Sequence, residues 1–338
     1  MTRTSSMNKR NFSRLRVIVI GDIMLDRSYI GRVCRLSPEA PVPVLTVDRQ
    51  TDTLGGAANV ARNCATLGAQ TLLVGSVGVD AAGKTVRKLM HEDGIIGRYV
   101  SEHLWPTVQK IRSSGQYPLL RADIEPHPSV YDACRINPLV LKPLVQNSDV
   151  IIISDYAKGY VTDAIIEVVR TSKRRCAVFA IDPKPKHGLD WRGADVLTPN
   201  AAEALEMSGI HFDGHSLAYP TAAVIAAIRS KYAPKALAIT RGAGGVTLAP
   251  KRGAIQHFGT TAKALDVCGC GDTFIAVMAL MLALGSTAAE AAAMANHAAG
   301  VAVACPGTAT VYPQDLVLPT YAKNNKPPVP RIKPQRKH

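Results

Sequence analysis

A glycine-rich turn beside a carboxylate is the stretch of this chain best suited to chemistry. The sequence DVCGCGDTF, residues 266–274, places Gly269, Cys270 and Gly271 directly before Asp272, and an apolar helical run follows. Glycine lets the backbone turn sharply and approach a ligand, and a helix N-terminus presents unpaired N–H groups and partial positive charge. The pattern predicts an anion cradle in which Asp272 accepts a proton from a substrate hydroxyl. An ordinary aspartate N-cap beside a glycine turn is the alternative, and this stretch alone favours neither.

Two further stretches could serve a nucleotide and its metal ion. TRGAGGV carries Thr240, Gly242 and Gly245 after a strand-like run, and such a turn can approach a phosphate. PNAAE places Asn200 and Glu203 three residues apart on one face of a helix start, where they could orient Mg²⁺ or its water shell. A hairpin turn explains the first stretch equally well. A capping box is the better explanation of the second when it is taken alone.

Polar groups at predicted strand ends could bind a polyhydroxylated ligand. Asp22 and Asp26 follow the apolar run LRVIVIG, and GGAANVARN brings Gly55, Gly56 and Asn59 to a helix start. Carboxylate and amide groups can each hydrogen-bond a sugar hydroxyl, although turns within the core explain the glycines as well.

Charged side chains on a predicted hairpin and after two later strands could meet an anionic substrate. They are Lys110, Arg112, Arg121 and Asp123 on the hairpin, and Lys158 and Lys184 in SDYAKG and DPKPK. Ordinary solvated charges are the alternative explanation for the whole set.

The cysteines do not predict a metal site or a secreted protein. The chain has seven cysteines, an odd number, and none of them form a CxxC pair. No apolar run is long enough to span a bilayer, and the basic N-terminus lacks the form of a signal peptide. We therefore expect a cytoplasmic protein that does not bind a membrane.

The net charge of +14 invites a nucleic-acid interpretation, but the positions of the charges weaken it. Residues 1–16 carry five basic residues and residues 321–338 carry six, with no acidic residue in either segment. Eleven of the fourteen net charges thus lie near the two ends. We expect disordered basic tails at 1–14 and 321–338 rather than a nucleic-acid interface.

The segments between these tails alternate between strand and helix patterns, which predicts an α/β fold with a mainly parallel sheet covered on both faces. Ligands bind such sheets beyond the carboxyl ends of the strands, where most of the polar groups named above fall. Two extended segments, about 29–54 and 104–124, break the alternation and predict a small β lid or an interface between subunits. The body is expected to span residues 15–320, with helices at 81–92, 163–172, 272–284 and 287–304.

The motifs agree in order and spacing with one family, because the chain resembles the ribokinase-type (PfkB-type) carbohydrate kinases. LGGAANVARNCATLGA is similar to the N-terminal motif of that family, and DVCGCGDTF is similar to its D-x-x-G-A-G-D motif. PNAAE and TRGAGG resemble its N-x-x-E and T-x-G-x-x-G elements. The resemblance implies a ribokinase-like three-layer sandwich with a β lid, and ATP and Mg²⁺ as cosubstrates.

The resemblance also implies roles for individual residues. Asp272 matches the general base, and Gly269, Cys270 and Gly271 match the anion hole. The matches to the nucleotide and metal elements are Thr240, Gly242, Gly245, Asn200 and Glu203, with Glu203 reaching Mg²⁺ through water and Asn296 lying near the adenine. The implied substrate contacts are Asp22, Gly55, Gly56, Asn59, Lys110, Arg112, Asp123 and Lys184. Cys270 departs from the usual alanine, and a thiol at a helix N-terminus can have a lowered pKa.

Within the family, the branch that this chain resembles acts on heptose 7-phosphate. The residues that carry this likeness are RLSPEAPVPVL, PTVQKIR, QYPLLRAD, SDYAKG and IDPKP. The likeness implies phosphorylation of D-glycero-β-D-manno-heptose 7-phosphate at its anomeric hydroxyl, on the route to ADP-heptose and lipopolysaccharide. It also implies a homodimer formed through the β lid. A kinase for fructose phosphate, ribose or a nucleoside is the alternative within the family, and a catalytically silent binding protein is the alternative outside it.

Overall fold

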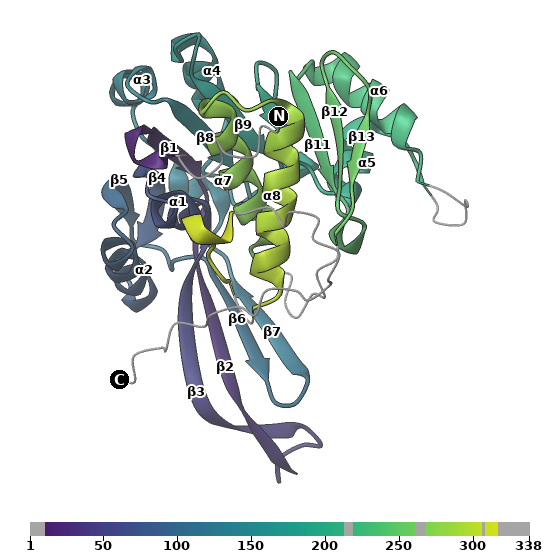
Figure 1. Cartoon of the computed structure of the whole chain (residues 1–338). Helices are drawn as coiled ribbons and strands as arrows, with labels where there is room; N and C mark the ends of the chain where they lie inside the picture. Colours follow the sequence, from purple (N-terminus) through teal and green to yellow (C-terminus); the bar gives the residue numbers. More distant parts are fainter. Residues whose placement is uncertain (1–10, 213–218, 261–267, 306–307, 317–338) are drawn as a thin grey trace.

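A computed structural model gives the fold and describes residues 11–212, 219–260, 268–305 and 308–316. Its main body has three layers, in which helices cover both faces of a central sheet, and a second sheet projects from the body (Figure 1). This is the predicted α/β sandwich with a lid.

The central sheet has nine strands in the order β13-β12-β11-β10-β9-β8-β1-β4-β5. The pairings from β11 through β5 are parallel, whereas β12 and β13 are antiparallel. The inner strands are nearly continuous runs of Val, Ile and Leu, as expected when both faces are buried. The strand bounds are β1 Arg16–Gly21, β4 Gln70–Gly78, β5 Ile96–His103, β8 Val150–Ser154, β9 Val178–Asp182, β10 Val196–Leu197, β11 Ala236–Thr240, β12 Val246–Pro250 and β13 Gln256–Phe258.

Two apolar clusters lie on opposite faces of the central sheet. One cluster joins the sheet to α1 (Ala57–Thr66), α2 (Ala81–Glu92), α7 (Cys270–Ala283) and α8 (Ala288–Val303). The other joins it to α3 (Pro138–Gln146), α4 (Asp163–Ser172), α5 (Ala201–Ser208) and α6 (Thr221–Tyr232). Helix α7 is buried almost throughout, which matches its apolar sequence on every side. The buried helix fixes the position of the residues at its N-terminus.

The lid is a four-stranded sheet in the order β3-β2-β6-β7 (Figure 1). Its strands are β2 Ile23–Leu36, β3 Pro43–Gly56, β6 Gln109–Ser114 and β7 Pro118–Ile124. The ends of β2 and β3 nearest the body are buried, whereas their far ends are half-buried or exposed. Both strands extend further into the body than the predicted range of 29–54, so Asp26 lies on a lid strand and not at the end of β1.

The predicted domain boundaries are only partly within the described residues. Residues 12–14 form a short 3-10 helix in which Phe12 is buried, so an N-terminal tail reaching residue 14 is too long. The burial of one large aromatic side chain explains this difference. Residues 1–10 and the predicted tail at 321–338 lie outside the described residues.

In the part of the chain that the structure describes, no helix has the length and apolar character needed to cross a bilayer.

Candidate active site

Polar residues line the carboxyl edge of the parallel strands. Asp22 follows β1, Asp155 follows β8, and Asp182 ends β9. Asn200 lies just after β10 and pairs with Thr240 at the end of β11. Adjacent parallel strands bring these side chains to one edge, which is where ligands bind such sheets.

Asp272 lies at the centre of this edge and is only 2% exposed. Its Oδ1 accepts a hydrogen bond from the Tyr156 hydroxyl at 2.7 Å, and its Oδ2 accepts one from Asn59 Nδ2 at 2.7 Å. Burial raises the pKa of Asp272 to about 6, although these two hydrogen bonds oppose the shift. A carboxylate with that pKa can accept a proton near neutral pH. The N-cap of α7 is Gly269, so the simple explanation of Asp272 as an N-cap is wrong.

The turn before Asp272 has the geometry of an anion cradle. Gly269 has φ of 75°, and a Cβ there would lie 2.6 Å from Asn59 Nδ2, so glycine is required. A Cβ at Gly271 would meet nothing within 4 Å. Thr273 N–H bonds to the Gly269 carbonyl at 3.0 Å, which leaves the amides of the preceding residues at the open end of the helix.

The Cys270 thiol behaves differently from the expectation for a helix N-terminus. Burial, and then the negative charge of Asp272, raise its pKa. The lowered pKa that a thiol at a helix N-terminus can have is not found here, because burial and a neighbouring carboxylate outweigh the backbone N–H groups of Cys270 and Gly271.

Asn59 brings an unsatisfied acceptor to the site. It is fully buried on α1, and its Oδ1 has no hydrogen-bond partner among the described residues. A buried unpaired acceptor is costly, and a ligand hydroxyl would satisfy it. The sequence-based assignment of Asn59 to the substrate fits this geometry.

Asp22 holds the loop after β8 through both of its carboxylate oxygens. Its Oδ2 accepts the backbone N–H groups of Tyr156 and Lys158 at 2.8 and 3.1 Å, and its Oδ1 accepts that of Tyr160 at 3.0 Å. The side chain is 2% exposed. Both oxygens hold the loop after β8, and because a carboxylate oxygen can accept more than one hydrogen bond, the sugar contact of Asp22 stays a prediction.

Gly55 and Gly56 are explained by close packing at the base of the lid. A Cβ at Gly55 would lie 2.7 Å from Asp26 Oδ2, and a Cβ at Gly56 would lie 2.4 Å from the Asp22 carbonyl oxygen. Gly56 also has φ of 59°. Both glycines bring the lid strand close to Asp22 and Asp26.

Two lysines flank the ring of Tyr156. Lys110 Nζ lies 4.7 Å from the ring centroid and Lys184 Nζ lies 5.7 Å from it. Burial lowers the pKa of Lys110, although the nearby carboxylates of Asp26 and Asp272 oppose the shift. Burial also acts to lower the pKa of Lys184, but its ion pair with Glu203 outweighs this and the net pKa is raised. Lys110 lies near Asp272, and both ammonium groups lie over the ring whose hydroxyl contacts Asp272, where they could bind an anionic substrate.

The remaining predicted cations already have carboxylate partners. Arg112 lies 3.2 Å from Asp26, and Arg121 forms two hydrogen bonds of 2.8 and 2.7 Å with Asp123. Lys158 pairs with Glu125. Lys184 is also paired, with Glu203, so what distinguishes Lys110 and Lys184 is their position over the ring of Tyr156. Asp123 faces Arg121.

The two stretches assigned to the nucleotide and the metal ion form the local structures given above as alternatives, a glycine turn between two strands and a capping box. Asn200 and Glu203 form a capping box, in which Glu203 Oε2 accepts the Asn200 N–H at 2.8 Å. The turn between β11 and β12 uses glycine at φ of 55° and 78°, at Gly242 and Gly245. A Cβ at Gly245 would lie 2.0 Å from the Phe258 carbonyl oxygen, so close packing also requires that glycine.

Asn296, on α8, lies beside this turn. Its Nδ2 donates to the Gly259 carbonyl oxygen at 2.9 Å. This places it next to the strand β13 that packs on β12, and its proximity to an adenine remains a prediction.

The residues fit a magnesium ion that is carried mainly by phosphate. Among the described residues, no group of three His, Cys, Asp or Glu side chains is arranged to hold a metal ion. Mg²⁺ in nucleotide sites takes few protein ligands and keeps several waters. Both Glu203 oxygens have partners, Lys184 and the Asn200 N–H, so a contact through water fits better than a direct one.

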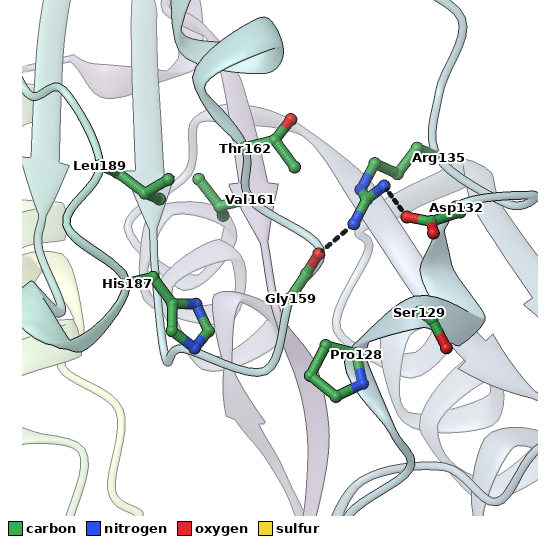
Figure 2. Close-up of a pocket in the computed structure, with 9 residues that line it drawn as sticks. All are labelled: Pro128, Ser129, Asp132, Arg135, Gly159, Val161, Thr162, His187 and Leu189. Carbon is green, nitrogen blue, oxygen red and sulfur yellow. Dashed lines mark hydrogen bonds and ion pairs between the residues drawn. The ribbon is translucent and has the colours of Figure 1, made fainter.

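A separate cleft of about 350 Å³ is lined in part by the loop after β8 (Figure 2). Its wall includes Gly159, Val161 and Thr162, and none of the predicted site residues line it. Arg135 donates to the Gly159 carbonyl oxygen at 2.7 Å and also pairs with Asp132 (Figure 2). This cleft therefore does not belong to the candidate site.

Three residues of the site were not identified from the sequence. Tyr156, Asp155 and Asp182 all lie at or just after strand ends, within the stretches SDYAKG and IDPKP. Burial raises the pKa of Asp155 to about 7, and burial together with the Glu203 charge raises that of Asp182 well above its usual value. The signal that could have found these residues is their position after buried strands.

Comparisons with known proteins show the family of this chain. The family model described as pfkB family carbohydrate kinase matches residues 14–315. A Bordetella bronchiseptica protein named D-beta-D-heptose 7-phosphate kinase is 40% identical over 305 residues, which cover 90% of this chain and 96% of that protein. A Caulobacter protein named Bifunctional protein HldE is 37% identical over 336 residues, and the chain spans 68% of its length.

Solved structures show the same fold. Arabidopsis thaliana ribokinase in complex with ribose and ATP has a TM-score of 0.70 at 18% identity, over 89% of this chain and 97% of that one. Escherichia coli phosphofructokinase-2 has a TM-score of 0.69 at 17% identity, over 89% and 97%. With the family model covering nearly the whole described body, the chain belongs to the pfkB family of carbohydrate kinases, phosphotransferases that act on a sugar hydroxyl.

Proposed function

We propose that this protein transfers the γ-phosphoryl group of ATP to the anomeric hydroxyl of D-glycero-β-D-manno-heptose 7-phosphate, giving the 1,7-bisphosphate. The observation that carries the proposal is the buried Asp272 at the start of α7, with two lysines within reach of the same tyrosine ring. The choice of sugar is supported by the relative named as a heptose 7-phosphate kinase. The enzyme would act in the cytoplasm and supply the synthesis of ADP-heptose for lipopolysaccharide.

The proposed step is an in-line displacement. Asp272 accepts the proton of the sugar hydroxyl as the hydroxyl oxygen forms a bond to the γ-phosphorus. The bond from that phosphorus to the β–γ bridging oxygen breaks at the same time. The amides of Cys270 and Gly271 at the α7 N-terminus stabilise the charge on the transferred group. Asn59 Oδ1 accepts a hydrogen bond from the sugar.

Lys110 and Lys184 are the groups that we assign to the phosphate of the substrate. Both approach the site from elements on either side of Tyr156, and an ammonium group binds phosphate as a compact charge. When bound with ATP, Mg²⁺ would neutralise phosphate charge, and Glu203 would hold it through water. Thr240, Gly242 and Gly245 would lie along the nucleotide.

A substrate panel tests the proposal. ATP consumption is measured with heptose 7-phosphate, fructose 1-phosphate, fructose 6-phosphate, ribose and adenosine, and phosphorus NMR identifies the position of the new phosphate. We expect the highest kcat/KM with heptose 7-phosphate and a new anomeric phosphate. Faster turnover of another sugar in the panel would assign the enzyme to another branch of the family.

We also propose that the protein is a homodimer formed through the lid. The outer parts of the lid carry exposed apolar side chains, including Leu36 at 61%, Tyr117 at 71% and Leu120 at 64% exposed. Exposed apolar groups gathered on one projecting sheet favour association, and a second copy presents the same surface.

A further inference from the structure

We propose that Tyr156 is a positioning residue for Asp272, and that its hydroxyl holds the carboxylate oriented and ionised for proton transfer. The inference rests on the function proposed above for Asp272. It concerns a residue that carries no role in that step, and it can be tested separately.

Two hydrogen bonds hold the Asp272 carboxylate in one orientation. Tyr156 donates to Oδ1 and Asn59 donates to Oδ2, each at 2.7 Å. The two donors come from different elements, the loop after β8 and helix α1, so they hold the carboxylate from two sides. Each carboxylate oxygen can accept more than one hydrogen bond, so an oxygen of Asp272 can still accept the substrate proton.

The loop that carries Tyr156 is held by buried groups rather than by secondary structure. Asp22 accepts three of its backbone N–H groups, and Asp155 Oδ1 accepts the Ala157 N–H at 2.8 Å. Ala157 adopts φ of 54°, which is unusual for a residue other than glycine. From the cleft side, Arg135 holds the carbonyl oxygen of Gly159 (Figure 2). Several independent contacts hold this loop in one conformation, as expected where a side chain must be placed accurately.

The ring of Tyr156 has a second contact set. Lys110 and Lys184 lie over it at 4.7 and 5.7 Å, within the range of cation–π attraction. The hydroxyl therefore contacts the proposed base, while the ring contacts both cations assigned to the substrate phosphate. Replacing the hydroxyl alone separates these two contacts.

Charged and titratable groups from several elements face Asp272. Asp26 on β2 and Asp182 on β9 are carboxyls, Lys110 on β6 is a cation, and Cys270 lies on the same helix. Asp26 raises the pKa of Asp272, whereas Asn59, Tyr156 and Lys110 lower it. Loss of the Tyr156 hydroxyl removes one of the stabilising hydrogen bonds and leaves the rest, so the pKa of Asp272 rises.

The first test is the pH profile of kcat/KM for Tyr156→Phe. We expect its acid limb to move up by about one pH unit, the typical worth of a hydrogen bond to a charged group. Activity then falls about tenfold below pH 6 and returns close to the wild-type value at pH 9, with KM for the sugar nearly unchanged. Tyr160→Phe is the matched control, because its hydroxyl contacts the Ile136 N–H instead. An acid limb that stays at the wild-type pH in Tyr156→Phe overturns the inference.

A second variant should shift the acid limb of the pH profile in the opposite direction. 2,3-Difluorotyrosine at position 156 is a stronger donor, so the acid limb should move to lower pH. A purely structural role for Tyr156 would give no shift in either direction. Tyr156→Leu, which also removes the ring, should raise KM for the sugar phosphate where Tyr156→Phe does not.

A readout without turnover separates this inference from the proposed function. The pKa of Asp272 is measured by carbon-13 NMR of protein labelled at the aspartate carboxyl carbons, with Asp272→Asn to assign the signal. An upward shift in Tyr156→Phe supports the inference even if no sugar of the panel is phosphorylated, and an unchanged titration rejects it even if the kinase assay succeeds.

Discussion

At the scale of single residues, the site depends on a carboxylate kept in an environment that opposes its charge. Asp272 is buried, and its pKa of about 6 results from burial opposed by two hydrogen bonds. Such a group is a better base near neutral pH than a solvated aspartate, because its proton affinity is higher.

Removal of this base should therefore affect turnover more than binding. We expect Asp272→Asn to lower kcat by about 10²–10⁴-fold, the usual worth of a positioned base, with little change in KM. Steady-state kinetics with the preferred sugar measure this effect. Turnover close to that of the wild type would remove Asp272 from the mechanism.

The same raised pKa predicts a cost to stability. Asp272 has a higher pKa in the folded than in the unfolded state. Its favourable contribution to the free energy of unfolding is therefore fully present below about pH 4 and is lost as the pH rises through about 6. From pH 4 to pH 7, Asp272→Asn should gain roughly 2–4 kcal/mol of unfolding free energy relative to the wild type. Urea unfolding at several pH values measures this difference.

Asp190 provides a control of opposite sign. Hydrogen bonds from Arg192 lower the pKa of Asp190, so the contribution of Asp190 to the free energy of unfolding is lost as the pH falls. Asp190→Asn should therefore lose stability relative to the wild type as the pH rises from acid to neutral. Parallel curves for the two variants would contradict at least one of the two assignments.

Cysteine reactivity is a further prediction at this scale. Burial and Asp272 raise the pKa of Cys270, whereas Cys34 and Cys176 are exposed. Since the thiolate is the reactive form, iodoacetamide at pH 7 should modify Cys34 and Cys176 well before Cys270. Mass spectrometry of timed samples gives the order, and early modification of Cys270 would contradict the assigned environment.

At the scale of elements, one capping box has two uses. Glu203 caps α5 through Oε2 and pairs with Lys184 through Oε1. Glu203 therefore combines the predicted helix cap with an ion pair, and its role toward a metal ion stays a prediction. The cap fixes the carboxylate at the carboxyl edge of the sheet.

Glu203→Gln tests the metal role against the cap. We expect the Mg²⁺ concentration for half-maximal activity to rise about tenfold, the lower end of the effect of losing an outer-shell partner. Glu290→Gln on α8 is the matched control, because Glu290 forms an equivalent capping box with Thr287. Identical Mg²⁺ titrations for the two variants would leave Glu203 with the capping role alone.

At the scale of the whole molecule, the lid strands run from the candidate site to a solvent-exposed outer end. Lys110 lies on β6 and Asp26 on β2, so the strands that project outward also supply charged residues near Asp272. Movement or association of the lid would therefore affect the site directly.

The proposed dimer is tested on the exposed lid residues. Leu120→Glu should weaken association by about 100-fold or more, because it places a charge in a buried apolar contact. Leu139→Glu is the control, since Leu139 is 80% exposed but lies on α3, away from the lid. Sedimentation over a range of concentrations distinguishes the two, and a wild-type monomer would refute the proposal.

The sequence by itself determined the order of elements and the glycine turn at the start of α7. Helices predicted at 81–92 and 163–172 match α2 and α4, and the lid segments form a separate sheet. These features are local, because hydrophobic periodicity and glycine turns are read within a few residues.

The tertiary structure decided which polar groups face one another. Tyr156 and Asp272 are 116 residues apart, and nothing in either local stretch predicts their contact. For the same reason, the sequence does not predict that Asp22 holds a loop 134 residues away. Burial by distant segments also set the pKa of Asp272 and Cys270, because desolvation depends on all the atoms packed around a group and not on its sequence neighbours.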